Sequence, residues 1–302
     1  MKIAFLFAGQ GAQAVNMGKD FYDSVLSVKE IYDQFEDIKS LCFEDKDGVI
    51  NQTMYAQKAM LLTSYAIANA LREKGITPEY SCGLSLGEYT ALTFSNVWSL
   101  KDAIEIISNR GRIMQNALPL GTTKMAAIIA CDRNVIQETL KEVKSGVVEI
   151  ANYNCPGQIV ITGENKAVDD AMLLLKDKAR RCIPLNVSGA FHCSLLNNAG
   201  KELREVLDRF TPAKPEYKIV YNVSGKEESR PLNDILQEQI CHSVYFEDSI
   251  RYLVSQGVDT FVEIGPGKTL SGFVKKTAPA EVKIYNVSDM TGFEETLKAF
   301  NL

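Results

Sequence analysis

GLSLG, residues 83–87 of this 302-residue chain, stands directly after the strand-like segment Tyr80–Cys82 and before a stretch with helical spacing. The pattern G-x-S-x-G between a strand and a helix is that of a nucleophile elbow, in which side chains two residues either side of the serine would collide. The turn presents the hydroxyl at a helix N-terminus, where free N–H groups and the helix dipole favour a developing anion. We therefore predict that Ser85 is a nucleophile.

The same serine also fits a simple helix cap. Ser85 and Glu88 have the spacing of a capping box, in which the two side chains bond each other's backbone N–H groups. A cap requires neither glycine on both sides nor a strand immediately before it, so the nucleophile is the favoured interpretation.

A serine hydroxyl needs a partner that takes its proton, most often a histidine, and the chain has two. His192 follows the predicted strand Cys182–Val187 through small residues, which places it where a strand ends. His242 follows the predicted helix Leu232–Cys241, where an imidazole commonly only bonds carbonyl groups. We predict that His192 is the base and His242 is structural. No acid is evident as a third member, and a backbone carbonyl could orient the ring instead.

Gly9-Gln10-Gly11 directly follows the first predicted strand, Ile3–Ala8. Small flanking residues let a backbone N–H group approach a ligand closely. The N–H groups of Gln10 and of Leu86, the residue after the serine, are therefore the predicted oxyanion hole. One such donor contributes about 3 kcal/mol to transition-state stabilisation.

A dinucleotide fingerprint is the alternative at this position. Gly9, Gly11 and Ala14 fit G-x-G-x-x-G/A after a strand. That motif requires a second strand that ends in an acidic residue about 20 positions further on. The segment that follows here, Met17–Phe35, is predicted to be a charged helix, which disfavours the dinucleotide interpretation.

The predicted helix Leu100–Ala117 carries an arginine in the middle of its apolar stripe. The stripe consists of Ala103, Ile106, Ile107, Ile113, Met114 and Ala117. A buried arginine is costly unless an anion meets it, and its planar fork suits a carboxylate held by two parallel hydrogen bonds. We therefore predict that Arg110 binds the carboxylate of a ligand; a structural Asp or Glu opposite it is the alternative.

Composition narrows the class of protein. Hydrophobic residues make up 46% and charged residues 24% of the chain, as in soluble globular proteins. The net charge of −5 disfavours nucleic-acid binding, and seven cysteines without a CxxC disfavour a disulfide framework or a metal site. The N-terminal apolar run is shorter than the apolar region of a signal peptide. No apolar stretch of the sequence reaches membrane-spanning length. We expect a cytoplasmic protein that binds no membrane.

The order of the predicted elements indicates an α/β fold with an insertion. Residues 123–188 have the predicted order βαββαβ, which is the split βαβ or ferredoxin-like unit. We predict that this segment is a small domain inserted into a larger α/β domain made of residues 1–122 and 189–302.

Segments spread along the whole chain give it a resemblance to the malonyl-CoA:acyl carrier protein transacylase family. They are FAGQGAQ (7–13), GLSLGEYTAL (83–92), NRGRIMQ (109–115), MAAIIA (125–130), NYNCPGQIVITG (152–163), VSGAFHCSLL (187–196) and VEIGPGKTLSGF (262–273). The resemblance implies an α/β-hydrolase-like core with a parallel sheet and a ferredoxin-like insertion. It also implies malonyl-CoA as the substrate, acyl carrier protein as the partner, no permanently bound cofactor or metal, and a monomer.

The resemblance assigns a role to residues within these segments. It implies Ser85 as nucleophile, His192 as base, the backbone N–H groups of Gln10 and Leu86 as oxyanion hole, Arg110 as the group that binds the free carboxylate of malonate, and Met114 and Phe191 in the acyl pocket.

The chain departs from the family pattern at a few positions. Leu84 stands where the family usually has histidine, and Ala8 replaces a common proline. Ser243 and Tyr245 replace a usual proline and glutamine in the segment whose main-chain carbonyl supports the catalytic histidine.

Two other functions remain open from the sequence. An esterase, or an editing enzyme that clears acyl groups from carrier proteins, would use the same Ser85 and His192 but more commonly has an evident acid. A carrier-protein docking module with an idle site would form no ester on Ser85. Whether the carrier serves fatty acid or polyketide synthesis is also open.

Overall fold

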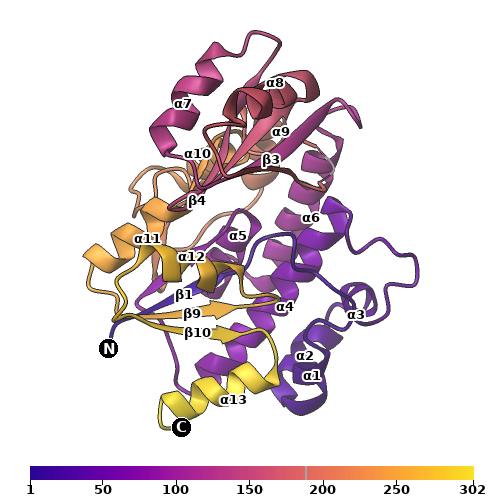
Figure 1. Ribbon diagram of the computed structural model, residues 1–302. Coiled ribbons are helices and arrows are strands. Elements are labelled where there is room, and N and C mark those ends of the chain that lie inside the picture. The colour runs from indigo at the N-terminus through magenta and orange to yellow at the C-terminus, as the bar shows by residue number, and fades with distance from the viewer. Residues whose placement is uncertain (188) are drawn as a thin grey trace.

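The computed structural model describes residues 1–187 and 189–302 and contains two five-stranded sheets (Figure 1). The strands of the larger sheet are all parallel, in the order β10-β9-β1-β2-β7. Their bounds are β1 Ile3–Phe7, β2 Tyr80–Gly83, β7 Lys218–Val220, β9 Thr260–Ile264 and β10 Lys283–Val287. The carboxyl ends of β1 and β2 therefore lie side by side, which brings the segments that follow them together.

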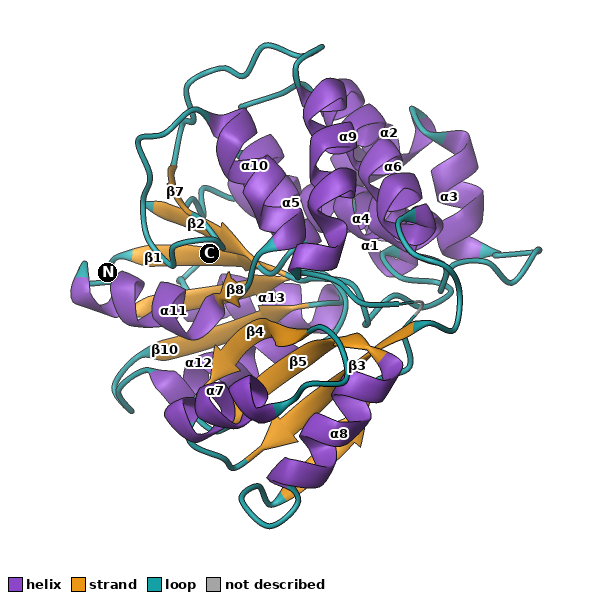
Figure 2. Ribbon diagram, turned by 90° about the horizontal axis from the view of Figure 1, so that it is seen from above, coloured by secondary structure: helices purple, strands orange, loops and turns teal. Residues whose placement is uncertain are grey.

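Helices cover both faces of the larger sheet (Figure 2). The helices of this part of the molecule are α1 Lys19–Ser24, α2 Leu26–Asp33, α3 Glu36–Phe43, α4 Thr53–Glu73, α5 Leu86–Phe94, α6 Leu100–Asn116, α9 Asn197–Leu207, α10 Leu232–Cys241, α11 Phe246–Ser255, α12 Thr269–Thr277 and α13 Met290–Ala299. In β1, Ile3, Phe5 and Phe7 pack in one core with α4–α6, and Ala4 and Leu6 pack in another with α11 and α12. Because side chains alternate along a strand, β1 must be apolar throughout to fill both cores.

The smaller sheet is mixed and has the order β6-β3-β5-β4-β8. Its elements are β3 Thr123–Ile129, α7 Arg133–Glu142, β4 Val148–Cys155, β5 Gln158–Glu164, α8 Asn165–Leu175, β6 Arg181–Pro184 and β8 Val244–Tyr245. The predicted βαββαβ order, and with it the fold class, is confirmed. The domain bounds stay a prediction, and residue 188 at the proposed boundary lies outside the described residues.

Strand β8 joins the two parts of the molecule. It comes from the segment between α10 and α11 and pairs in parallel with β4. At this junction the rings of Tyr153 and Tyr245 stack with centroids 5.0 Å apart, and the guanidinium of Arg133 lies 3.8 Å from the Tyr153 centroid. Arg133 also forms an ion pair of 3.1 Å with Asp248 on α11. The sequence did not predict this connection.

Several elements differ from the sequence-based expectation. The single helix predicted over Met17–Phe35 is two helices, because Val25 is extended at φ −123° and ψ 114°. The break lets Phe21 pack against Phe293, while Tyr32 reaches Thr63 on α4 with a hydrogen bond of 2.7 Å. Helix α3 and the short strands β7 and β8 were not predicted. No helix in the described ranges is long and apolar enough to cross a bilayer.

The turn between β2 and α5 has the geometry of the elbow. Ser85 has the strained backbone angles φ 55° and ψ −106°. A Cβ atom on Gly83 would lie 2.0 Å from the backbone carbon of Gly87, and one on Gly87 would lie 2.1 Å from the carbonyl oxygen of Phe7. Only glycine fits either position. The capping-box alternative is wrong, because the Ser85 side chain forms no cap and Glu88 bonds another segment.

We predict that Gly83→Ala lowers the thermal unfolding midpoint by several degrees, because the new methyl group collides with backbone that cannot move aside. A cost of about 3 kcal/mol corresponds to a shift of roughly 6–12 °C. Gly272→Ala is the matched control: it lies in α12 with no atom within 4 Å of the added Cβ, so its midpoint stays equal or rises. Equal midpoints for the two variants, measured by circular dichroism, would contradict the tight elbow.

Candidate active site

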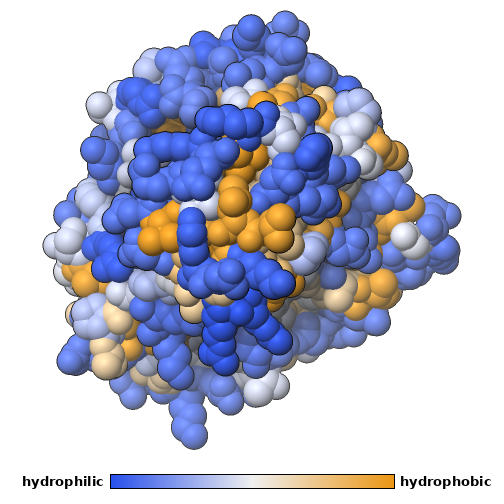
Figure 3. Space-filling model, turned by 45° about the horizontal axis from the view of Figure 1, so that its top comes forward, coloured by the Kyte–Doolittle hydropathy of each residue, from blue (hydrophilic) through white to orange (hydrophobic). Residues whose placement is uncertain are grey.

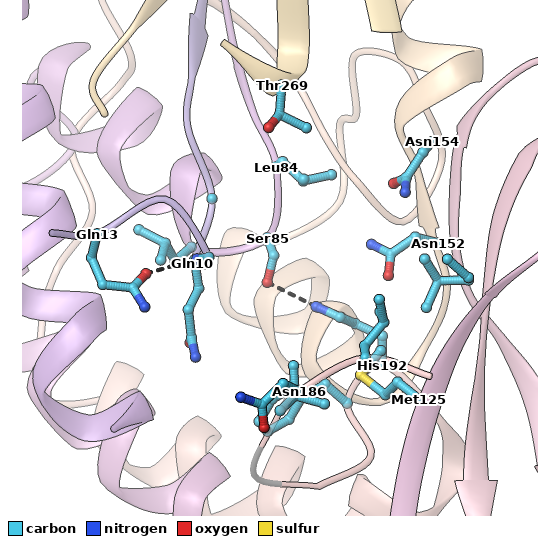
Figure 4. Close-up of a pocket in the computed structure, with 18 of the residues that line it drawn as sticks. Gln10, Gln13, Leu84, Ser85, Met125, Asn152, Asn154, Asn186, His192 and Thr269 are labelled. Atoms are coloured by element: carbon cyan, nitrogen blue, oxygen red, sulfur yellow. Dashed lines mark hydrogen bonds between the residues drawn. The ribbon is translucent and has the colours of Figure 1, made fainter. Parts of the chain in front are cut away.

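A cavity of about 740 Å³ opens between the two sheets, within the usual size range of small-molecule sites. The larger-sheet side contributes the 9–11 turn and the elbow, and the smaller sheet contributes side chains such as Met125 and Asn152 (Figure 4). Apolar surface gathers near the middle of the molecular face seen in Figure 3, between hydrophilic side chains above and below it. The predicted site residues Gln10, Ser85, Leu86, Met114, Phe191 and His192 line this cavity, whereas Arg110 is not among its lining residues and reaches it only through its contact with Ser85.

Ser85 and His192 are in direct contact in this cavity. The Ser85 Oγ and His192 Nε2 atoms are 2.7 Å apart (Figure 4). His192 Nδ1 lies 2.7 Å from the carbonyl oxygen of Gln239. A carbonyl oxygen can only accept, so Nδ1 carries the proton and Nε2 is left to accept the hydrogen bond of the serine hydroxyl. The pair has the geometry of a nucleophile and its base.

Burial keeps the imidazole of His192 neutral. Desolvation, followed by the positive charge of Arg110, lowers the pKa of His192 to about 4. The supporting carbonyl belongs to Gln239 on α10, slightly before the segment of Ser243 and Tyr245 where the sequence placed it. A main-chain carbonyl thus takes the place of the third, acidic member that the sequence lacked.

The loop that carries His192 is fastened to the smaller sheet. The predicted strand Cys182–Val187 ends at Pro184, so a longer loop than expected leads to the histidine. The backbone N–H of Ala190 donates to Thr123 Oγ1 at 3.0 Å, and that of Ser194 donates to Glu149 Oε2 at 2.9 Å. The base is therefore positioned by strands β3 and β4, while the nucleophile belongs to the larger sheet.

Asn222, which the sequence did not single out, fixes the elbow. Its Oδ1 accepts the backbone N–H of Ser85 at 2.7 Å, and its Nδ2 donates to the carbonyl oxygen of Gly83 at 2.7 Å. Both bonds hold the strained turn from the side of β7. Because β7 was not predicted, no signal in the sequence pointed to this asparagine.

Gln10 and Leu86, whose backbone N–H groups are the predicted oxyanion hole, both line the cavity. Leu86 is the first residue of α5, whose N–H has no partner inside the helix. A Cβ atom on Gly9 would lie 2.7 Å from the Leu84 carbonyl oxygen, so the 9–11 turn lies directly against the elbow. Within the described residues, neither of these N–H groups donates a hydrogen bond. Their role as an oxyanion hole stays a prediction.

Arg110 is fully buried beside the nucleophile. Its Nη1 donates to Gln57 Oε1 at 2.7 Å, and its Nη2 donates to Gln239 Oε1 at 2.9 Å and to Ser85 Oγ at 3.2 Å. These acceptors carry no charge, and no ion pair within the described residues includes Arg110. A directly paired structural carboxylate, the alternative from the sequence, is therefore not found.

Met114 and Phe191 line the same cavity, as does Leu84. The Met114 sulfur accepts a hydrogen bond from Gln57 Nε2 at 3.4 Å. His242 lies outside the cavity lining, and its Nδ1 contacts the Glu238 carbonyl at 3.1 Å, as expected for a histidine that caps a helix. The buried amides Gln57 and Gln239 were not predicted as site residues from the sequence, although each interrupts an apolar helix face.

Comparisons with known proteins agree along the whole chain. Residues 4–292 match the family model described as "Acyl transferase domain". The chain is 42% identical over 313 residues to the malonyl CoA-acyl carrier protein transacylase of Bacillus subtilis (strain 168), with 99% of this chain and 98% of that protein covered. It is 36% identical over 309 residues to the transacylase of Staphylococcus aureus (strain MRSA252), with 97% and 99% covered.

Solved structures give the same result. The malonyl CoA-acyl carrier protein transacylase of Clostridium perfringens ATCC 13124 superposes with a TM-score of 0.97 at 39% identity, covering 100% of this chain and 98% of that one. A malonyl-transacylase in complex with a type II polyketide acyl carrier protein gives 0.95 at 33% identity, covering 99% and 100%. The resemblance that the sequence motifs indicated is confirmed: the chain belongs to the acyl transferase domain family, among the malonyl CoA-acyl carrier protein transacylases.

Proposed function

We propose that this chain transfers a malonyl group from malonyl-CoA to the phosphopantetheine thiol of an acyl carrier protein, through an ester on Ser85. The observation that carries the proposal is the buried guanidinium of Arg110. Its hydrogen-bond acceptors are uncharged, and its Nη2 lies 3.2 Å from Ser85 Oγ. A site for a neutral acyl group has no use for such a cation. The names of the full-length relatives and the carrier-protein complex of one structural neighbour support the same substrate and partner.

The first half of the reaction forms the ester. Ser85 Oγ attacks the thioester carbonyl while His192 Nε2 takes the hydroxyl proton, and the backbone N–H groups of Gln10 and Leu86 bind the oxyanion. The C–S bond then breaks, and the proton on His192 passes to the departing sulfur, so coenzyme A leaves as a thiol. No electrons are lost or gained, so this step needs no redox cofactor.

The second half reverses these events with a different thiol. The phosphopantetheine thiol of the carrier gives its proton to His192 Nε2 and attacks the ester carbonyl. The Ser85 oxygen leaves with that proton, and the serine is regenerated. Both thiol substrates use one cavity in turn, which gives ping-pong kinetics.

Arg110 is proposed to set the acyl selectivity. Its planar guanidinium suits a carboxylate held by two hydrogen bonds, and the malonyl carboxylate supplies the charge that Gln57 and Gln239 do not. A neutral acyl chain would leave the buried cation without an anion, which costs binding energy. Met114 and Phe191 would then form the apolar wall around the short acyl group.

We expect Ser85→Ala to form no acyl-enzyme when incubated with malonyl-CoA, because the attacking oxygen is gone. Intact-mass spectrometry measures the adduct directly. Ser108→Ala is the control, since the Ser108 hydroxyl donates to the carbonyl oxygen of Ile104 within its own helix, α6. A malonyl adduct that persists on Ser85→Ala at the level of the control contradicts the assignment of the nucleophile. An adduct that forms on the unaltered chain and hydrolyses faster than it transfers indicates a hydrolase.

Arg110→Ala is predicted to lower kcat/KM for malonyl-CoA by roughly 10²–10³-fold, the cost of removing one partner of a desolvated charge pair. The loss for acetyl-CoA should be less than about tenfold, because that substrate has no carboxylate. Arg112→Ala on the same helix removes a surface arginine that pairs with Glu202 and should change neither value. Equal losses for malonyl and acetyl transfer would refute the carboxylate role.

The low pKa of His192 predicts a wide acid tolerance of the transfer step. The base acts as the neutral imidazole, so kcat/KM should stay level between pH 7 and about 5 and fall near pH 4. The same shift also makes stability depend on pH. The unfolded histidine binds a proton below about pH 6.5, whereas the folded one binds it only near pH 4, so the free energy of unfolding falls as the pH drops from about 6.5 to 4. A pH–rate profile with its acid midpoint near 6.5 contradicts the neutral, buried base.

A further inference from the structure

Glu88 is a buried carboxyl group that the proposed reaction leaves unused. It lies on α5 one turn after Ser85, and its side chain is fully buried. Its Oε2 accepts the backbone N–H of Asn222 at 2.6 Å, whereas its Oε1 has no hydrogen-bond partner within the described residues. A carboxylate without full hydrogen bonding is costly in such a place, so the group needs either a proton or a counter-charge.

The counter-charge near Glu88 is the cation of the substrate site. Arg110 is equally buried, is bonded only to uncharged acceptors, and interacts electrostatically with Glu88. Geometry places the two groups close together: the ring centroid of Tyr89, the residue after Glu88, lies 4.9 Å from the Arg110 guanidinium carbon, and Arg110 Nη2 donates to Gln239 Oε1 at 2.9 Å. A titratable carboxyl group and a cation are therefore buried close together next to the nucleophile.

We propose that Glu88 sets the charge that Arg110 offers to the substrate: protonated, it leaves the guanidinium free for a carboxylate, and ionised, it competes with that carboxylate as an internal counter-ion. The inference rests on the proposed malonyl transfer. Glu88 acts through Arg110 and is thus a positioning residue that determines acyl specificity. It would favour carboxylate-bearing thioesters at neutral pH and weaken their binding in alkaline solution.

The ionisation of Glu88 falls in the range where this competition can be observed. Desolvation outweighs the hydrogen bond from Asn222 and the charge of Arg110, and it raises the pKa of Glu88 to about 8. At pH 7 the group is therefore mostly neutral. A substrate carboxylate at Arg110 brings a second negative charge close by and raises that pKa further. Binding above pH 8 must then be accompanied by proton uptake.

Other titratable groups that interact with Glu88 are Cys82 on β2, Tyr89 on α5, Tyr221 after β7 and Arg110 on α6. Burial lowers the pKa of Arg110, but a guanidinium keeps its proton inside a protein. Burial raises the pKa of Cys82 to about 12 and those of Tyr89 and Tyr221 higher still. The pKa of His192, which also interacts with Arg110, is lowered to about 4. A transition near pH 8 in this cluster therefore reports Glu88.

Steady-state kinetics of Glu88→Gln test the proposal. If only the protonated form binds the carboxylate, KM for malonyl-CoA rises roughly tenfold between pH 7 and pH 9 in the unaltered chain. KM for acetyl-CoA changes less than about twofold. The neutral amide of Glu88→Gln removes the rise for malonyl-CoA and leaves its KM low at both pH values. Tyr89→Phe removes a different buried hydroxyl next to Arg110 and keeps the rise.

An alkaline rise in KM that is the same in Glu88→Gln and in the unaltered chain overturns the role of Glu88. So does a rise of equal size for malonyl-CoA and acetyl-CoA. Failure of the proposed function looks different: the unaltered chain then forms no malonyl ester even at pH 7. The two failures are therefore distinguished in one set of measurements.

A second measurement avoids any change at Glu88 and remains decisive if Glu88→Gln does not fold. Calorimetric titration of Ser85→Ala with malonyl-CoA, in two buffers of different ionisation heat, counts the protons taken up on binding. We expect a substantial fraction of one proton at pH 8.5 and almost none at pH 6.5, with none for acetyl-CoA at either pH. Absence of uptake at pH 8.5 despite binding contradicts the proposal.

Discussion

The buried guanidinium of Arg110 is the constraint on which the site depends. An arginine cannot shed its proton inside a protein, so the fold must supply hydrogen-bond acceptors without water; here both Nη atoms have them, and Nε has none within the described residues. Its partners come from α4, the elbow and α10, which are far apart in the chain. Each is an uncharged oxygen, which fixes the direction of the fork and leaves the charge available. The arrangement is stable only while these three elements keep their relative positions.

Gln239 couples that constraint to the chemistry. Its side-chain Oε1 accepts from Arg110, its Nε2 donates to the Ser85 carbonyl at 2.8 Å, and its own carbonyl orients His192. One residue thus contacts the cation, the elbow and the base. The loop of His192 is fastened to the smaller sheet instead, so the nucleophile and base meet only when both sheets are assembled. The stacked Arg133, Tyr153 and Tyr245 at the β4–β8 junction stabilise that assembly.

Local patterns allowed the elbow, the βαββαβ unit and the position of Arg110 to be predicted from the sequence. Each depends on neighbours in the chain: two glycines around a serine, or a charge within a helical stripe. What could not be predicted depends on distant contacts. The break at Val25 becomes favourable only through packing on α4 and α13, and β8 has two residues that form a strand solely because β4 is beside them. The roles of Asn222 and Gln239 likewise depend on partners more than a hundred residues away.

The central place of β1 has a consequence for how the chain is made. Strand β1 is made before β2 and β9 and lies between them in the sheet, with β2 on one side and β9, Thr260–Ile264, on the other. At a synthesis rate of about 5–20 residues per second, the edge of β1 that pairs with β9 therefore waits roughly 13–50 s for its partner. During that interval its unpaired backbone groups can join strands of other nascent chains. Efficient production of this protein will thus depend on how well chaperones cover an unfinished sheet.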